Sequence, residues 1–193
     1  MPIGAGCSDT TPRGIVRPKA SPPVKNFLLG VITTLLVVAI GIPVYLRLGL
    51  AEVRADIPPS RWERSFMSSA VRASVRRRAP EMPNPIAPTE ENLIEGGKLY
   101  VNECAGCHGT PGKPNESSEA LYPPIPDFPA VGTQYSEAQI FWIAKHGIRL
   151  SGMFANGKWD SDQKLWTITA YLARIKSLPQ RVQEELAKPS PAK

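Results

Sequence analysis

Two thiols and an imidazole stand close together at positions 104, 107 and 108. Cys104 and Cys107 are three positions apart and His108 follows directly, in the order Cys-Ala-Gly-Cys-His. Two thiols at this spacing can each add to one vinyl group of a haem, while the adjacent imidazole reaches the iron. We therefore predict one covalently bound haem c, with thioether bonds to Cys104 and Cys107 and with His108 as an axial ligand of the iron.

Two other uses of closely spaced cysteines need surroundings that this chain lacks. A thioredoxin-like dithiol requires a strand–helix–strand context, which the flanking sequence does not provide. A structural zinc site requires four ligands, and within residues 89–178 the one further Cys or His is His146. The motif and its surroundings therefore favour haem over both alternatives.

The sixth position of a haem iron needs a soft or basic side chain, or it stays open. Met153 lies in a Leu-Ser-Gly-Met-Phe segment where glycine allows the backbone to approach a flat ring closely. His146 stands between Lys145 and Gly147, a pattern typical of a helix C-terminus, where the helix dipole favours basic groups. We predict Met153 as the second axial ligand, with His146 or an open position as the alternatives.

Three helices are expected to position these residues within a domain of about ninety residues, 89–178. Thr89 can cap a first helix that runs up to the cysteines, and Ser136 can begin a second with a capping box. A third helix starts at Asp160 or Ser161. Because no repeat and no alternating strand pattern is present, we predict an all-α domain.

An apolar run precedes this domain. The residues Phe27–Leu46 are twenty consecutive uncharged residues bounded by Lys25 and Arg47. At ~1.5 Å per residue a helix of this length spans about 30 Å, the hydrocarbon thickness of a bilayer. A cleaved signal peptide is the alternative, but its apolar core is normally ~7–15 residues long. We predict a transmembrane helix at 26–48.

The connecting region 49–88 contains one more predicted helix. The residues Arg61–Arg78 have helical composition, with Trp62 and Phe66 on one face and several arginines. A short basic amphipathic helix beside a membrane can lie on anionic lipid headgroups. The alternative is a solvated spacer helix.

Proline-rich segments follow at two places. Four prolines between residues 80 and 88 predict a stiff, extended linker that holds the next domain away from the bilayer. The segment 179–193 is expected to be a fraying C-terminal tail.

The distribution of charge argues against a nucleic-acid-binding protein. The chain carries 23 Lys and Arg against 17 Asp and Glu, a net charge of +6. Residues 89–193 contain eleven basic and twelve acidic residues, so the positive excess lies in the first 88 residues, around the apolar run. This arrangement is typical of attraction to a membrane surface, and we predict no nucleic-acid partner.

The sequence resembles the class I monohaem c-type cytochromes that carry an N-terminal membrane anchor. The similarity covers roughly residues 27–178. Two stretches surround the iron-binding motif: ENLIEGGKLYVNECAGCHG resembles the first helix and haem motif of the family, and YPPIPDF resembles its proline-rich loop. Further along the chain, FWIAKHGIRLSGMFA resembles the methionine loop and LWTITAYLARIKSLP the last helix. Family members usually have proline after the ligand methionine, whereas Phe154 stands here.

The resemblance implies a fold and a set of supporting contacts. We expect a small, all-α class I cytochrome c domain around one covalent haem, preceded by a single transmembrane helix. The second nitrogen of His108 would donate to a backbone carbonyl at about Tyr122 to Pro126. The first and last helices would cross where Gly96 or Gly97 packs against Trp166 or Tyr171.

Covalent haem attachment also fixes the expected location. In bacteria the maturation apparatus works on the outer face of the cytoplasmic membrane. We therefore expect a bacterial inner-membrane protein with one span, a flexible cytoplasmic tail at 1–25 and a periplasmic haem domain. Cys7, in that tail, is interpreted as a plain cytoplasmic thiol.

The expected function is electron transfer without catalysis, because His108 and Met153 together leave no open position on the iron. The first hypothesis is a tethered carrier between a quinol-oxidising complex or dehydrogenase and a terminal oxidase or reductase. The second is a fixed cytochrome subunit of a larger membrane oxidoreductase, and the third is a haem sensor or peroxidase-like enzyme with a displaceable Met153. Redox proteins and membrane lipid are the expected partners, with Lys145, Arg149 and Lys158 as a basic rim beside the methionine loop.

Overall fold

The computed structural model describes residues 24–188, except the side chains of residues 117 and 119, and the chain divides into two compact units between Val53 and Arg54. Nearly all of the predicted tail at 1–25, with Cys7, lies outside the described residues, as does the end of the predicted C-terminal tail.

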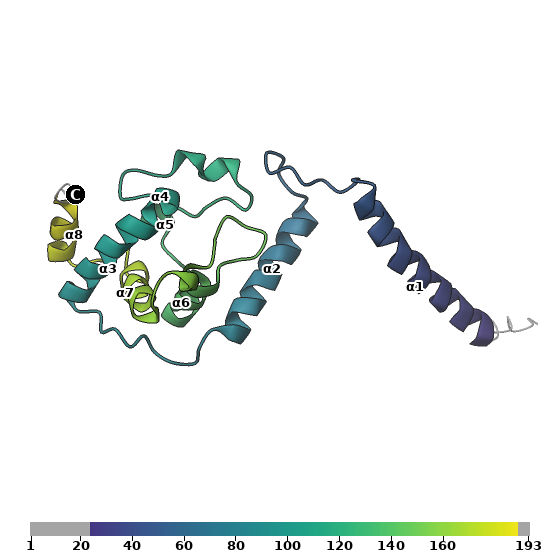
Figure 1. Cartoon of the computed structure of the whole chain (residues 1–193), viewed down its shortest axis with the longest axis horizontal. Coiled ribbons are helices and arrows are strands. Elements are labelled where there is room, and N and C mark those ends of the chain that lie inside the picture. The colour runs from purple at the N-terminus through teal and green to yellow at the C-terminus, as the bar shows by residue number, and fades with distance from the viewer. Residues whose placement is uncertain (1–23, 189–193) are drawn as a thin grey trace, which may run out of the picture. The chain divides into compact units, whose positions relative to one another are not determined.

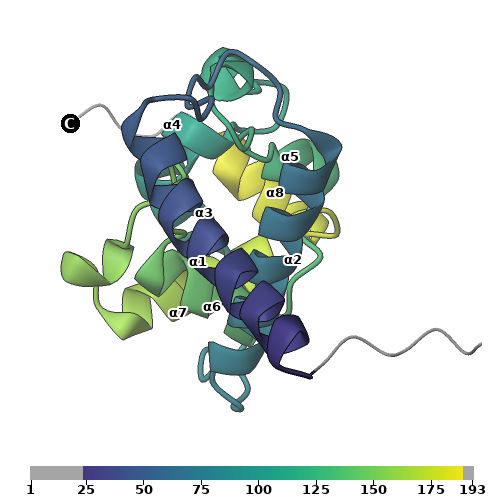
Figure 2. The same cartoon turned by 90° about the vertical axis from the view of Figure 1, so that its right-hand side faces the viewer.

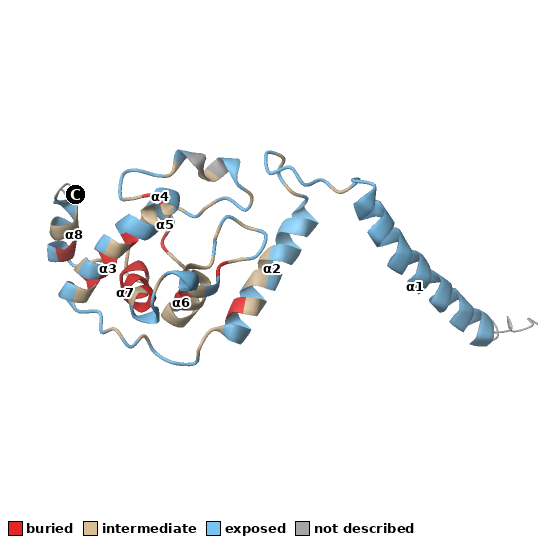
Figure 3. Cartoon of the chain, viewed as in Figure 1, coloured by how far each residue is buried: buried red, intermediate tan, exposed pale blue. Residues whose placement is uncertain are grey.

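The first unit contains α1 (Val24–Arg47), which includes the predicted apolar run (Figure 1). None of its residues is buried, and the helix is coloured as exposed along its whole length (Figure 3). By length and composition α1 could cross a membrane, and a signal sequence would meet the same criteria. An apolar helix with no buried face needs an apolar surrounding from outside this unit.

The second unit is helical, and its described residues form no strand, only an isolated bridge between Thr110 and Lys113. The α-helices are α2 (Arg61–Arg78), α3 (Glu90–Glu103), α4 (Ala105–His108), α5 (Phe128–Val131), α6 (Glu137–His146), α7 (Asp162–Leu172) and α8 (Gln180–Ala187). Two 3₁₀ turns lie at Glu116–Ala120 and Asn156–Lys158. The prediction of an all-α fold with one apolar N-terminal helix is confirmed.

The predicted helix starts are also confirmed. The Thr89 hydroxyl accepts a hydrogen bond from the Asn92 backbone N–H at the start of α3. Ser136 and Gln139 form a complete capping box at α6, and Ser161 caps α7. These caps satisfy backbone N–H groups that have no partner within the helix.

The core forms where α3 packs against α7 and where α6 covers another side of α7. Every residue from Leu165 to Leu172 is buried. A Cβ built on Gly96 would lie 2.4 Å from the Thr167 carbonyl oxygen and 2.8 Å from the Tyr171 Cβ, so only glycine permits this approach. Of the two aromatic partners expected at this crossing, Tyr171 is the one in place. Trp166 instead stacks on Phe141 of α6, with ring centroids 3.9 Å apart.

The C-terminal segment differs from the expectation of a fraying tail. Pro179 precedes α8, in which Val182 is fully buried against Leu93 and Ala170. Leu186, four residues later on the same face, reaches Gly97 of α3. The prediction was wrong because it was based on the flanking prolines alone. The apolar pair of Val182 and Leu186 binds residues 180–187 to the domain.

The proline-rich segment before α3 was predicted to be a stiff, extended linker that holds the domain away from the bilayer, but in the structure it packs on the surface of the domain. The Asn84 side-chain amide donates to Glu137 Oε2 at 2.7 Å and to the Trp166 carbonyl at 3.1 Å. Ile86 packs against the cluster around Trp166. One amide and one apolar side chain among the prolines therefore bind this segment to α6 and α7.

Helix α2 belongs to the same unit and lies beside α6 (Figure 1 and Figure 2). Val75, near its C-terminal end, is 1% exposed. Trp62 and Phe66, on the first half of the helix, are exposed and stacked on each other at 5.4 Å. One face of α2 is thus bound to the domain, which neither sequence-based alternative for this helix anticipated.

Candidate haem site

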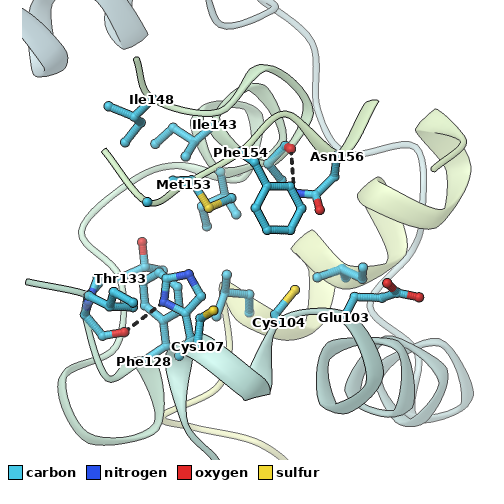
Figure 4. Close-up of a pocket in the computed structure, with 18 of the residues that line it drawn as sticks. Glu103, Cys104, Cys107, Phe128, Thr133, Ile143, Ile148, Met153, Phe154 and Asn156 are labelled. Atoms are coloured by element: carbon cyan, nitrogen blue, oxygen red, sulfur yellow. Dashed lines mark hydrogen bonds between the residues drawn. The ribbon is translucent and has the colours of Figure 1, made fainter. Parts of the chain in front are cut away.

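A mainly apolar cavity brings the four predicted site residues together (Figure 4). Cys104, Cys107 and His108 enter it from the end of α3 and from α4. Met153 enters from the loop after α6 and lies across the cavity from the two cysteines. Residues separated by more than forty positions in the sequence therefore share one site.

The short helix α4 holds the cysteine motif in a defined turn. Cys104 continues the hydrogen bonding of α3, because its N–H donates to the Tyr100 carbonyl at 2.8 Å. Gly109 ends α4 with φ at 75°, a left-handed conformation that favours glycine. The buried Tyr100 hydroxyl donates to the Gly109 carbonyl at 2.9 Å, and the Asn115 amide donates to the Cys107 carbonyl at 2.9 Å. Both ends of the motif are thereby fixed to the backbone around it.

His108 is oriented as the resemblance implied. Its Nδ1 lies 2.9 Å from the Pro126 carbonyl oxygen, which can only accept, so Nδ1 carries the proton. Burial lowers the pKa of His108, although the hydrogen bond to Pro126 opposes this shift. The ring also stacks on Phe128, with centroids 4.4 Å apart. A neutral imidazole with Nδ1 engaged leaves the Nε2 lone pair available for a metal.

The loop that carries Met153 is held tightly against the end of α6. The Ile148 N–H donates to the Met153 carbonyl at 2.9 Å, and the Met153 N–H donates to the Ser151 hydroxyl at 3.2 Å. A Cβ on Gly147 would lie 2.6 Å from the Met153 carbonyl oxygen, so the loop passes where only glycine leaves room. These contacts therefore fix the backbone of Met153 at the point where its side chain enters the cavity.

His146 does not reach the cavity. It is the last residue of α6, it is exposed, and its ring contacts Trp142 at 5.0 Å between centroids. The backbone reverses at Gly147, with φ at 66°, as a helix C-cap does. The geometry thus matches the interpretation of His146 as a C-terminal helix residue and gives no support to the alternative of His146 as a ligand.

The two cysteines lie in different environments. Cys107 is exposed, whereas Cys104 is half-buried. Burial, followed by the nearby carboxylates of Glu103 and Asp160, raises the pKa of the Cys104 thiol to about 12. Cys104 is therefore a neutral thiol at physiological pH. In thioether formation its S–H would add across a vinyl group of the haem, as that of Cys107 would across the other.

The cavity fits a haem by its chemistry as well as by its ligands. Aliphatic side chains from α6 and α7 line it, together with the imidazole of His108 and the thioether of Met153. The apolar wall is formed by Ile140, Ile143, Ala144, Leu165, Ile168 and Leu172. A flat apolar macrocycle with a metal at its centre matches this lining, and the two thiols that could attach it covalently line the same cavity.

Several supporting residues were not anticipated from the sequence. Tyr100 precedes Cys104 by four residues, so helix periodicity places both on the same face of the helix. This spacing could have identified Tyr100 from the sequence. Phe128 begins the four-residue helix α5 after a proline-rich loop, where no periodic pattern exists to identify it. Lys164 bridges two carboxylates of the cavity wall, Asp160 four residues before it and Glu103, which is distant in sequence.

Comparison with known families defines the class of this domain. Residues 91–172 match the family model described as cytochrome C oxidase, cbb3-type, subunit III. The matched segment contains the cysteine motif and Met153, and its regular elements in the structure are helices. Residues 91–172 therefore form a c-type cytochrome domain.

Such a domain carries a covalently bound haem c and functions in electron transfer. Among solved structures, the chain is similar to a chain of a reducing HAO-like protein complex from Kuenenia stuttgartiensis, with 25% identity and a TM-score of 0.39. That alignment covers 50% of each chain, so the present chain spans about half the length of that protein. No curated protein matches the chain.

Proposed function

We propose that this chain is a membrane-tethered monohaem cytochrome c that carries single electrons on the periplasmic face of a bacterial cytoplasmic membrane. Its donor would be a quinol-oxidising complex or a dehydrogenase, and its acceptor a terminal oxidase or reductase. Cys104 and Cys107 hold the haem, and His108 and Met153 bind its iron. The observation that carries the proposal is the placement of Met153 across one cavity from the cysteine motif.

The site residues suit an electron carrier, because they restrict motion around the iron. When bound, the haem takes up and releases one electron. The Pro126 carbonyl and the Phe128 ring hold the imidazole of His108, and backbone hydrogen bonds hold the loop of Met153. Side chains held in this way would keep the reorganisation between oxidation states small, and with both His108 and Met153 on the iron no position would be left for a substrate.

A redox partner would dock near the methionine loop. Phe154 and Trp159 form an exposed edge-to-face pair there, with centroids 6.0 Å apart, and Arg149 and Lys158 are exposed beside it. Lys145, the third member of the expected basic rim, forms an ion pair with Asp162, with 2.7 Å between Nζ and Oδ2. A small surface with an aromatic centre and a few cations suits a weak, transient complex with an acidic partner.

The first test follows the electron in membranes that contain the full chain. We expect the reduced haem spectrum after addition of quinol, and its loss on admission of oxygen. Cys104→Ser combined with Cys107→Ser removes the covalent haem and should abolish this signal. A haem that remains oxidised when quinol is added would contradict the proposed place between donor and acceptor.

For the membrane association we propose that α1 spans the bilayer and that α2 rests on its anionic surface. Phe66 and Val75 are nine residues apart, so at ~100° per residue they point to opposite sides of the helix. Val75 faces the domain, and the stacked pair of Trp62 and Phe66 therefore faces away from it. Residues 48–60 between the helices reach about 45 Å when extended, which keeps this pair within range of the membrane.

Tryptophan fluorescence tests the position of α2, because α1 contains no tryptophan. The full chain is placed in vesicles of phosphatidylcholine and phosphatidylglycerol, with part of the lipid brominated as a quencher. We expect quenching that disappears in Trp62→Phe, while Trp159→Phe, on the methionine loop, serves as the matched control. Equal quenching of the wild type and Trp62→Phe would contradict the lipid contact.

The family match favours a second candidate, a fixed cytochrome subunit of a larger membrane oxidoreductase. This function predicts that the chain stays bound to other subunits through purification in mild detergent. A free carrier purifies alone. Size-exclusion chromatography of the solubilised chain, followed by haem absorption, separates the two candidates.

A further inference from the structure

Three charged side chains form a cluster at the edge of the cavity that contains Cys104. The Lys164 ammonium donates to Glu103 Oε1 at 2.6 Å and to Asp160 Oδ1 at 2.7 Å. Glu103 is the last residue of α3, Asp160 precedes α7, and Lys164 lies in the first turn of α7. We call these three residues the Lys164 cluster.

Both carboxylates of the cluster belong to the cavity wall. Glu103 and Asp160 line the same cavity as the two cysteines, and Figure 4 shows Glu103 next to Cys104. The Asp160 side chain is only 11% exposed, and those of Lys164 and Glu103 are 26% and 39% exposed. Charges this close to an apolar cavity are screened less by water than charges on an open surface.

The charges of the cluster do not cancel. Two carboxylates and one ammonium leave a net charge of −1 beside the place where the haem is attached. An oxidised haem carries one more positive charge than a reduced haem. Nearby negative charge therefore stabilises the oxidised form and lowers the reduction potential, and nearby positive charge raises it.

We propose that the Lys164 cluster sets the reduction potential of the haem. Lys164 offsets one of the two carboxylates and keeps the potential above the value that two unopposed carboxylates would give. The cluster thereby determines which donors and acceptors can exchange electrons with this domain. This inference rests on the proposed electron carrier, because it assigns residues that tune the same haem.

The test compares substitutions that remove charges of opposite sign from one cluster. Midpoint potentials are measured by spectroelectrochemical titration of the purified full chain with its haem. We expect a lower potential for Lys164→Gln and a higher potential for Asp160→Asn and Glu103→Gln. Asp160→Asn should give the larger rise because its side chain is less exposed. Lys164→Arg keeps the charge and should retain the wild-type potential.

A purely structural role of the cluster predicts a different result. Each of the three charge-removing substitutions breaks at least one ion pair of the cluster, and a looser cavity that admits water would lower the potential in all of them. Shifts of one sign in all three variants would therefore overturn the proposal. If Lys164→Gln does not retain haem, the rise in the other two variants decides the question.

The pair of Lys145 and Asp162 is the matched control, since its N–O distance is 2.7 Å and neither residue lines the cavity. Lys145→Gln and Asp162→Asn should leave the potential unchanged, and shifts equal to those of the cluster would contradict the proposal. The absorption spectrum of the wild type separates a failure of the proposed electron carrier from a failure of the proposed role of the Lys164 cluster. A spectrum without methionine ligation refutes the proposed ligand set, whereas the signs of the potential shifts test the Lys164 cluster on any covalently attached haem.

Discussion

Helices α1 and α7 are both rich in apolar residues, but they are surrounded differently. Within the described residues, α1 has 24 residues and buries none of them, whereas α7 has 11 and buries eight in succession. Helix α7 is enclosed by α3, by α6 and by the cavity that fits a haem. A helix that is apolar on all sides needs either a protein core or a bilayer. Helix α7 has a protein core around it, whereas α1 has none within its unit, and this contrast is the basis of the membrane span that we propose for α1.

The largest effect is expected from a charge placed in α7. Ile168 is 3% exposed and lines the cavity, so Ile168→Arg would bury an unpaired cation at a cost of several kcal/mol. We expect loss of the folded domain and of its haem. A haem-stained gel of membranes measures this, and wild-type staining would contradict the assignment of α7 to the core.

The same type of substitution in α1 should change location and leave the domain intact. An arginine near the centre of a membrane span costs ~2.5–3.5 kcal/mol, so Leu35→Arg with Leu36→Arg costs about 5–7 kcal/mol. We expect the chain to leave the membrane fraction after carbonate washing. Its haem spectrum should be unchanged, and Leu35→Ile with Leu36→Ile is the control that should stay in the membrane. Retention of the double arginine variant would show that α1 does not anchor the chain.

A smaller effect is expected from one methyl group added to each region. Gly96→Ala would bring a Cβ to 2.4 Å from the Thr167 carbonyl oxygen, so α3 and α7 must move apart. The expected loss is about 1–3 kcal/mol in the free energy of unfolding, measured by denaturant titration of the haem-containing protein. Gly30→Ala in α1 meets nothing within 4 Å and should leave the domain's unfolding unchanged. Equal stability of the two variants would refute the close crossing of α3 and α7.

Local chemistry made much of the site predictable. The spacing of Cys104, Cys107 and His108 defines a covalent haem motif by itself, and helix caps such as Ser136 depend only on neighbouring residues. Met153 could be selected because few soft ligands exist downstream of the motif. The contact of His108 with the proline-rich loop followed from the family resemblance, and the structure confirms it at Pro126.

Most of the features that escaped prediction depend on contacts between distant parts of the chain. Asn84 donates hydrogen bonds to Glu137 and to the Trp166 backbone, and no sequence pattern around Asn84 predicts those partners. Lys164 and Glu103 are 61 positions apart and form an ion pair only because α3 crosses α7. The burial of Val182 requires the groove next to Leu93. Sequence patterns identify an apolar or charged residue, but the fold determines what it contacts.

The visible spectrum of the detergent-solubilised full chain, oxidised and then reduced with carbon monoxide present, tests the central claim most directly. A carrier with His108 and Met153 on the iron should show the weak far-red band of sulfur–iron ligation when oxidised and no change with carbon monoxide when reduced. Met153→Ala should keep the haem, lose that band and bind carbon monoxide. A wild-type spectrum without the band and with ready carbon monoxide binding would contradict the carrier and favour a haem sensor or a peroxidase-like enzyme.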